Sequence, residues 1–145
     1  MTTLIIQSLP DYTHAQLVTA TGRAFLADEP RQDDGDDFGP TPYELLTAAL
    51  GACTAMTLQI YARRKEIPLE EVVVEVEHER IHAVDCESCD DPKHGFIEAL
   101  HRRIVVRGPL SDAQRDDLLR VANRCPVHKT LSAVPRILDS IEVVS

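Results

Sequence analysis

Short segments with strand-like patterns stand at both ends and in the middle of this chain. Residues 15–21 and 23–28 are two such segments, rich in residues that favour strands, and Gly22 separates them. Two strand-forming runs joined at a turn glycine are typical of a β-hairpin. The sequence therefore predicts a hairpin near the N-terminus, followed by an exposed polar loop over residues 28–40.

Strict alternation of apolar and polar residues marks a longer strand over residues 71–82. One face carries Val72, Val74, Val76 and His78, and the other carries Val73, Glu75, Glu77 and Glu79. A second extended segment covers residues 96–107, so the two predict a long hairpin with a loop over residues 85–95. Residues 136–144 alternate again, and we expect them to form a closing strand.

One long helix is predicted from residue 41 to about residue 65. Thr41 and Glu44 form a capping-box pattern, in which each side chain accepts from the backbone N–H of the other residue. Pro42 at the first helical position strengthens this prediction, and Pro68 prevents continuation. Because the helix is apolar on most sides, we expect it to be buried in the core.

Two shorter helices are expected in the last third of the chain. Ser111 and Gln114 offer another capping box, and an apolar stripe follows as far as Arg124. A helix over residues 126–133 comes next, after Cys125, and Pro135 ends it. The pattern as a whole predicts an α+β fold in a single domain over residues 1–145, without internal repeats.

Composition and charge narrow the possible functions. The chain has 145 residues, of which 43% are hydrophobic and 27% are charged, so a folded core is expected. The formal net charge of −9 repels nucleic-acid backbones and anionic membranes, which argues against both as partners. The N-terminus shows no secretory signal, and polar residues interrupt the apolar run 45–62, so we expect a cytoplasmic protein that does not span a membrane.

Two of the four cysteines occupy unlike settings. Cys53 lies in the apolar helix, where a free cysteine commonly packs as a small hydrophobic residue. Cys125 precedes Pro126, so we expect it at the cap of a new helix. Unpaired N–H groups and the helix dipole favour the thiolate there. If the fold brings the two sulfurs together, the chain has a nucleophile and a resolving partner.

A Cys-x-x-Cys pair lies in the loop of the predicted long hairpin. Cys86 and Cys89 are flanked by His82 and His94, and two thiolates with two imidazoles are ligands that zinc prefers. The histidine spacing is not that of a standard zinc finger. Three interpretations stay open for this pair: a zinc site, an auxiliary redox pair, or no chemistry at all.

Two segments carry a resemblance to a known family. Residues 39–57 (GPTPYELLTAALGACTAMT) and 124–131 (RCPVHKTL) resemble the two signature segments of the OsmC/Ohr family, the osmotically inducible and organic-hydroperoxide-resistance proteins. The resemblance implies an α+β fold in which two subunits intertwine as a homodimer, with antiparallel sheets wrapped around two central helices. It also implies active sites at the subunit interface and a thiol peroxidase that needs no organic cofactor.

The resemblance assigns roles to the two thiols. Cys53 falls where the family has its peroxidatic cysteine, which attacks a hydroperoxide and becomes a sulfenic acid. Cys125 falls where the family has its resolving cysteine, so an intramolecular disulfide between them is implied. An external dithiol must reopen that disulfide, and the family points to a lipoyl-type donor.

The family also uses an arginine from the N-terminal loop region to stabilise the peroxidatic thiolate, held by a glutamate near the start of the first helix. Arg31 and Arg23 are the candidates here, and we favour Arg31 because it lies in the loop that leads to the helix. Many relatives carry the acidic residue one position before Glu44, where this chain has Tyr43. Glu44 therefore either holds the arginine or only closes the capping box.

Two rival functions remain at this level. In the first, Tyr43 has silenced the peroxidase, and the protein is a non-peroxidatic thiol, zinc-binding or redox-sensing member that uses Cys86 and Cys89. In the second, the protein carries a small molecule in an apolar pocket around Cys53. Zinc content separates the first rival from a peroxidase, and ligand retention without turnover separates the second.

Overall fold

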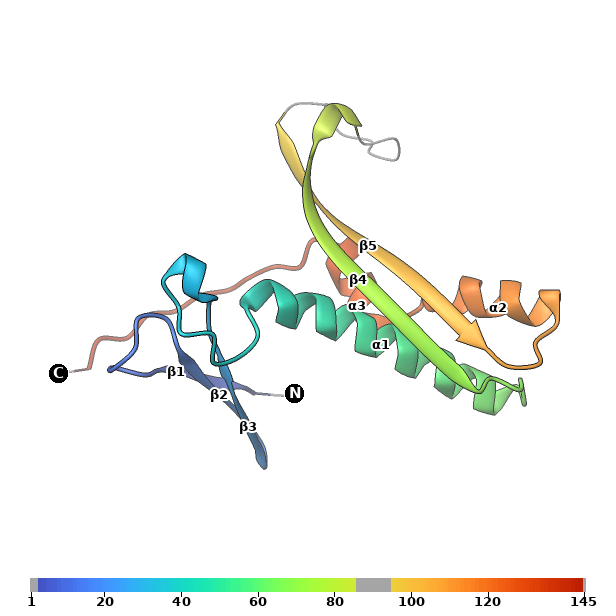
Figure 1. Ribbon diagram of the computed structural model, residues 1–145, viewed down its shortest axis with the longest axis horizontal. Helices are drawn as coiled ribbons and strands as arrows, with labels where there is room; N and C mark the ends of the chain where they lie inside the picture. The colour runs from blue at the N-terminus through green and yellow to red at the C-terminus, as the bar shows by residue number, and fades with distance from the viewer. Residues whose placement is uncertain (1–2, 86–94, 145) are drawn as a thin grey trace. The chain divides into compact units, whose positions relative to one another are not determined.

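The computed structural model describes residues 3–85 and 95–144, and it has a mixed α+β architecture (Figure 1). Antiparallel strands and helices alternate along the chain as the sequence predicts. The order is β1 (Ile5–Ser8), β2 (Gln16–Ala20), β3 (Arg23–Ala27), η1 (Arg31–Asp33), α1 (Pro42–Arg64), β4 (Glu71–His82), η2 (Ala83–Asp85), β5 (Phe96–Arg107), α2 (Asp112–Ala122) and α3 (Pro126–Ser132).

The chain divides into two compact units. The first comprises Met1–Ala48 and Arg80–Glu98, and the second comprises Ala49–Glu79 and Ala99–Ser145. Each unit is described by itself below. Helix α1 and the hairpin of β4 and β5 contribute to both, because the division falls within these elements.

The first unit is built on a three-stranded antiparallel sheet with the order β1, β2, β3. Val18 of β2 is 5% exposed and lies opposite Ile6 of β1 and Phe25 of β3. Gly22 forms the turn between β2 and β3 with a φ of +73°, which glycine adopts readily. The predicted hairpin is confirmed, whereas β1 was not predicted because four residues are too few to establish an alternating pattern.

A buried carboxylate organises the loop after β3. Asp28 is 3% exposed, and its oxygens accept backbone N–H groups from Glu29 at 2.8 Å, Asp36 at 3.1 Å and Phe38 at 3.3 Å. Burial alone raises the pKa of Asp28, but these hydrogen bonds outweigh it and hold the pKa below 3.8. The loop that carries η1 is therefore wrapped around one ionised side chain.

Close packing also holds this loop against β3. A Cβ atom on Gly39 would lie 1.8 Å from the carbonyl oxygen of Leu26. No larger residue fits at that position without moving the backbone. The glycine thus allows the chain to turn from the loop into α1.

The second unit has its core where α1 meets α2. Leu58 and Ala62 of α1 pack against Leu118, Val121 and Ala122 of α2, and all five side chains are buried. Within this unit the hairpin of β4 and β5 runs alongside α1 (Figure 1). The core therefore holds three layers of the unit together: the hairpin, α1 and α2.

Strand β4 alternates between an inward and an outward face over most of its length as predicted, β5 does so less regularly, and both strands have the predicted bounds. Its outward face carries cross-strand ion pairs, including Arg103 with Glu75 at 2.8 Å and Arg107 with Glu71 at 3.2 Å. Exposed pairs of this kind each contribute little to stability. The inward face, with partly buried Val72, Ile104 and Val106, packs on the core.

The predicted closing strand over residues 136–144 is not formed, which corrects the sequence analysis. After α3 the described chain has no regular structure, and Ile137, Leu138 and Ile141 are 81%, 90% and 94% exposed. An alternating segment becomes a strand only beside a free strand edge. In the part of the chain that the structure describes, no strand pairs with this segment.

Helix α1 is the one described helix that is long and apolar enough to cross a membrane by length and composition, with a mean hydropathy of 1.4. Core helices of globular proteins pass the same test. Only 28% of that apolar window is buried in the structure, so the burial on most sides that the sequence predicts is not observed. One face of α1, which includes Leu58 and Ala62, packs against α2.

The buried carboxylate of the first unit gives a pH-dependent stability. Because folding lowers the Asp28 pKa, the ionised group stabilises the fold above its unfolded pKa of about 3.9, and this stabilisation is lost as the pH falls through the lower folded pKa. We expect Asp28→Asn to lower the urea midpoint at neutral pH. The difference from wild type shrinks as the pH is lowered below about 4.

Asp33→Asn is the matched control for this substitution, since Asp33 is an exposed residue of the same loop. It removes the same charge and should leave the urea midpoint unchanged. Equal losses in the two variants would show that net charge, and not the Asp28 hydrogen bonds, sets the effect.

Candidate active site

The two thiols meet within the second unit. Cys53 lies on α1 and is half-buried, and Cys125 precedes α3 and is fully buried. The two thiols lie close enough for each to shift the pKa of the other. The structure therefore brings together the two cysteines that the sequence singled out, although their roles in a reaction stay predictions.

Local sequence explains the position of Cys125. Helix α2 ends at Ala122, and a short turn leads to Cys125, which is the N-cap of α3, with Pro126 as the first helical residue. The Cys125 sulfur accepts the backbone N–H of His128 at 3.5 Å. The predicted capping position is confirmed, and it exposes the sulfur to the unpaired donors of a helix start.

Cys125 is the more acidic thiol of this pair. Burial acts to raise the pKa of Cys125, but hydrogen bonds from Cys53, His128, Thr54 and Val127 outweigh it and lower that pKa below its usual value. Burial and the hydrogen bond that Cys53 donates to Cys125 raise the pKa of Cys53. Two thiols this close titrate as a coupled pair, in which Cys125 ionises first.

An arginine that the sequence analysis did not select completes the surroundings of the thiols. Arg102 of β5 donates from Nη1 to Thr54 Oγ1 at 2.8 Å and to the carbonyl oxygen of Ala122 at 3.3 Å. Its Nη2 donates to Asn123 Oδ1 at 2.9 Å. Thr54 is fully buried, and its hydroxyl also lies 2.7 Å from the carbonyl oxygen of Leu50.

A signal for Arg102 was present in the sequence. The alternation of β5 places residues 102, 104 and 106 on the inward face, and two of these three are the apolar residues Ile104 and Val106. A cation at the remaining inward position needs polar partners inside the fold, since burying an unpaired charge is costly. The period-two pattern thus indicates a functional or structural role for this arginine.

The other two predicted site residues lie in the first unit. Arg31 begins η1 and is exposed. Glu44 closes the predicted capping box: its Oε2 accepts the N–H of Thr41 at 2.8 Å, and Thr41 Oγ1 accepts the N–H of Glu44 at 3.2 Å. The capping role of Glu44 is confirmed, whereas the activating role of Arg31 and a catalytic role of Glu44 stay predictions.

A pocket of about 250 Å³ lies beside the thiols. Its wall includes Thr57, whose hydroxyl donates to the Cys53 carbonyl oxygen at 2.7 Å, and Pro126, which follows Cys125. Ile60, Tyr61 and Val121 supply apolar surface, and Arg64 and Arg124 supply positive charge. A small molecule with an apolar part fits this lining.

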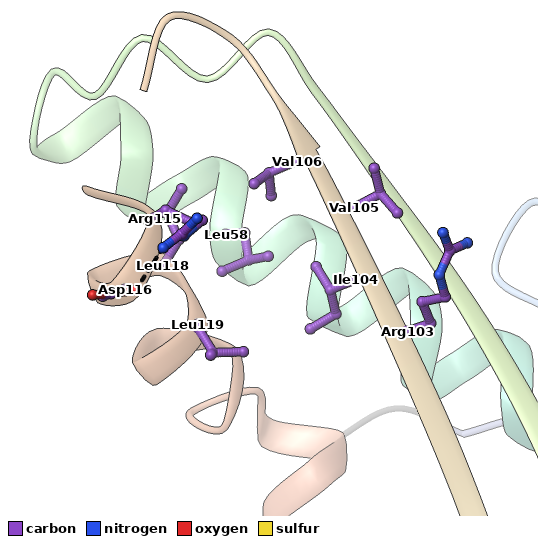
Figure 2. Close-up of a pocket in the computed structure, with 9 residues that line it drawn as sticks. All are labelled: Leu58, Arg103, Ile104, Val105, Val106, Arg115, Asp116, Leu118 and Leu119. Atoms are coloured by element: carbon purple, nitrogen blue, oxygen red, sulfur yellow. Dashed lines mark ion pairs between the residues drawn. The ribbon is translucent and has the colours of Figure 1, made fainter. Parts of the chain in front are cut away.

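A second pocket, of about 420 Å³, lies between β5 and α2 (Figure 2). Leu58, Ile104 and Val106 form its apolar floor, with Leu118 and Leu119 on the α2 side. Neither cysteine of the pair lines this pocket or the smaller one, but Thr57 and Pro126 of the smaller one are close to them in the sequence.

The Cys-x-x-Cys pair falls outside the described residues, as does His94. His82 ends β4, and its ring packs edge-on against Phe96 with the ring centroids 5.1 Å apart. Among residues 3–85 and 95–144, no group of three or more His, Cys, Asp or Glu side chains is arranged to hold a metal ion. The zinc and redox interpretations of Cys86 and Cys89 therefore stay untested.

Comparison with known proteins places this arrangement in a family. Residues 33–138 match the family model described as OsmC-like protein. No curated protein matches the chain. An OsmC-like protein from Mycoplasma pneumoniae has the same fold, with a TM-score of 0.68 and 22% sequence identity, and the match covers 92% of this chain and 89% of that chain.

Two solved structures named for hydroperoxide resistance also share the fold. The organic hydroperoxide resistance protein OsmC from Legionella pneumophila has a TM-score of 0.66 at 19% identity, covering 92% of this chain and 90% of its own. The organic hydroperoxide resistance protein OhrB of Bacillus subtilis has a TM-score of 0.62 at 16% identity, covering 92% of both chains. Identities this low establish the fold alone.

The proton positions can be tested by following thiolate absorbance in the ultraviolet during a pH titration. With Cys86 and Cys89 changed to serine, we expect the first thiolate to form at Cys125, so Cys125→Ala removes the step at lower pH. Cys53→Ala keeps that step but moves it to higher pH, because Cys125 loses a hydrogen-bond donor.

The opposite pattern would contradict this assignment. If the step at lower pH disappears in Cys53→Ala and survives in Cys125→Ala, the thiolate of the resting protein lies on Cys53.

Proposed function

The chain belongs to the family of OsmC-like proteins, and we propose that it is a thiol-dependent peroxidase that reduces organic hydroperoxides. The observation that carries this proposal is the proximity of the Cys53 and Cys125 thiols, each of which shifts the pKa of the other. Two neighbouring thiols are the arrangement that a sulfenic acid and its resolving partner require. The fold shared with two organic hydroperoxide resistance proteins supports the same reaction class.

Cys53 is the thiol that attacks the peroxide, since it is half-buried whereas Cys125 is fully buried. Its proton passes to the neighbouring Cys125 thiolate. The Cys53 sulfur then attacks the distal peroxide oxygen, and the O–O bond breaks. The departing alkoxide takes the proton back from Cys125, so an alcohol leaves and the Cys125 thiolate is restored.

The second step closes the disulfide. The Cys125 thiolate attacks the sulfur of the Cys53 sulfenic acid, the S–S bond forms and the S–O bond breaks. Hydroxide leaves and becomes water with a proton from solvent. An external dithiol, of the lipoyl type in our proposal, reopens the disulfide by exchange. We place the protein in the cytoplasm, where such reductants keep thiols reduced.

The pocket beside the thiols receives the organic part of the substrate. Ile60, Val121 and Pro126 provide apolar walls, and Thr57 and Pro126 connect the pocket to the two cysteines. Hydrocarbon enters such a pocket more favourably than water does. This lining favours an organic hydroperoxide over hydrogen peroxide.

We further propose that the protein acts as a homodimer. The segment after α3 exposes Ile137, Leu138 and Ile141 almost completely, and Met56 and Ile60 are 59% and 49% exposed on one face of α1. Burying a side chain of this size contributes about 1.5–3 kcal/mol. A second copy that supplies a strand edge for residues 136–144 and a surface for α1 covers these residues.

The disulfide can be tested directly by mass spectrometry. We expect one equivalent of cumene hydroperoxide to remove two hydrogen atoms from the reduced protein, with the new disulfide mapping to Cys53 and Cys125. Cys53→Ser should not form it, whereas Cys125→Ser should accumulate a Cys53 sulfenic acid that dimedone traps. Unreacted Cys53, or oxidation confined to Cys86 and Cys89, would rule out the proposed mechanism.

The dimer can be tested with one charge placed on the exposed segment. If residues 136–144 pair as a strand, Ile137, Ile141 and Val143 share one face. We expect Ile141→Asp to shift sedimentation equilibrium from dimer toward monomer, because the new charge would be buried at the interface. Ser140→Asp adds the same charge on the other face and should sediment as wild type. A wild-type protein that sediments as a monomer would refute the proposal.

A further inference from the structure

Arg102 differs from its neighbours on β5 in what it contacts. His101 and Arg103 point outward and pair with Glu79 and Glu75 at 2.6 and 2.8 Å. Arg102 lies on the inward face, and among the described residues no carboxylate pairs with it. All of its observed hydrogen bonds go to uncharged oxygen atoms. A cation held in this way is costly to bury, which calls for an explanation beyond fold stability.

The three acceptors of Arg102 share one property: each is linked to a thiol of the pair. Thr54 follows Cys53 on α1 and lies close enough to Cys125 to lower the pKa of its thiol. The Ala122 carbonyl oxygen also accepts the backbone N–H of Cys125, at 3.4 Å. Asn123 is the C-cap of α2, from which the chain turns to Cys125. One guanidinium thus connects both sides of the thiol pair.

The contact with Thr54 also orients a hydroxyl. Because Thr54 Oγ1 accepts an N–H of Arg102 and donates its own proton to the Leu50 carbonyl oxygen, the Thr54 side chain is held from two sides. Thr54 also lowers the pKa of Cys125, which places its side chain near the Cys125 thiol. Arg102 therefore acts on the position of Cys125 through Thr54 without contacting the sulfur.

We propose that Arg102 is the positioning residue for the resolving thiol: through Thr54 and the Ala122–Asn123 turn, it holds the Cys125 sulfur against Cys53 and so accelerates closure of the disulfide. The inference rests on the proposed function, because the organic hydroperoxide is the oxidant that produces the Cys53 sulfenic acid. The step it concerns is the attack of the Cys125 thiolate on the Cys53 sulfenic acid, in which the S–S bond forms, the S–O bond breaks and hydroxide leaves as water.

The test separates the two steps of the reaction in a protein whose Cys86 and Cys89 are serine. In Arg102→Met, we expect dimedone-trapped Cys53 sulfenic acid to form as fast as in wild type after a pulse of cumene hydroperoxide. Disulfide closure, followed by quenched mass spectrometry, should be slower by about tenfold, the effect of losing a hydrogen bond to a charged group. With excess peroxide, Cys53 sulfinic acid then accumulates.

Arg103→Met is the matched control, because Arg103 is the next residue of β5 and pairs outward with Glu75. It removes the same charge without touching the thiols, so both steps should run as in wild type. Thr54→Val and Asn123→Ala each remove one acceptor of Arg102, so each should also make disulfide closure slower than in wild type. These two variants keep the proposal testable if Arg102→Met does not fold.

A spectroscopic measurement distinguishes positioning of the thiol from general stability. The groups around the Cys125 sulfur are Cys53 and Thr54 from α1, Arg102 from β5, and Arg124 and His128 beside it in the chain. In Arg102→Met, the Cys125 thiolate absorbance should appear at higher pH than in wild type. Arg102→Lys should restore part of the shift, since one ammonium can reach Thr54. A loss of stability alone would not move this titration.

The failure of this inference is distinguishable from failure of the peroxidase proposal. If cumene hydroperoxide leaves wild-type Cys53 unoxidised, the peroxidase proposal is wrong. The variants are then compared with an azo oxidant such as diamide, which closes the same disulfide without a peroxide. The role of Arg102 is refuted if, with whichever of the two oxidants closes the wild-type disulfide, Arg102→Met closes it as fast as wild type. It is also refuted if Arg103→Met slows closure as much as Arg102→Met does.

Discussion

The proximity of Cys53 and Cys125 is the constraint on which the proposed chemistry depends, and the packing of the second unit maintains it. The two residues are far apart in sequence and come together because α1 and α2 share one core. Leu58 of α1 and Leu118 of α2 are fully buried against each other's helices. Once that packing fixes α2, the short turn after Ala122 determines where Cys125 lies relative to α1. Core packing thus sets the geometry of the thiols to the precision that a sulfur–sulfur reaction needs.

The two thiols differ in acidity and in exposure to solvent. Cys53, Thr54 and the backbone N–H of His128 lower the pKa of Cys125, which is the more acidic thiol and is fully buried. Cys53 is the less acidic thiol but the more accessible sulfur. In our proposal, this difference lets the Cys125 thiolate act first as a base and then as a nucleophile toward Cys53, without exposing a second reactive group to oxidants.

Several helices and strands could be predicted from the sequence, because interactions between residues close in the chain determine where they begin and end. Thr41, Pro42 and Glu44 specify the start of α1 through backbone capping, and the alternation over residues 71–82 specifies β4 without knowledge of its neighbours. The N-cap position of Cys125 follows from Pro126 in the same way. The closing strand failed as a prediction because a strand requires a partner edge, which sequence periodicity does not supply. Arg102 was missed because its acceptors are far from it in the sequence, with Thr54 on α1 and the other two, Ala122 and Asn123, at the end of α2.

The site also divides the expected chemistry between the two units. The disulfide-forming step needs Cys53, Cys125 and the Arg102 contacts, and all of these lie in the second unit. Deprotonation of Cys53 is opposed by burial and by the hydrogen bond to Cys125, both of which raise its pKa. The cation expected to counter this, Arg31, lies in a loop that is folded around the Asp28 carboxylate in the first unit. In our proposal, the residues that close the disulfide thus share one packed unit, whereas the activating role predicted for Arg31 belongs to a loop with its own anchor, the Asp28 carboxylate.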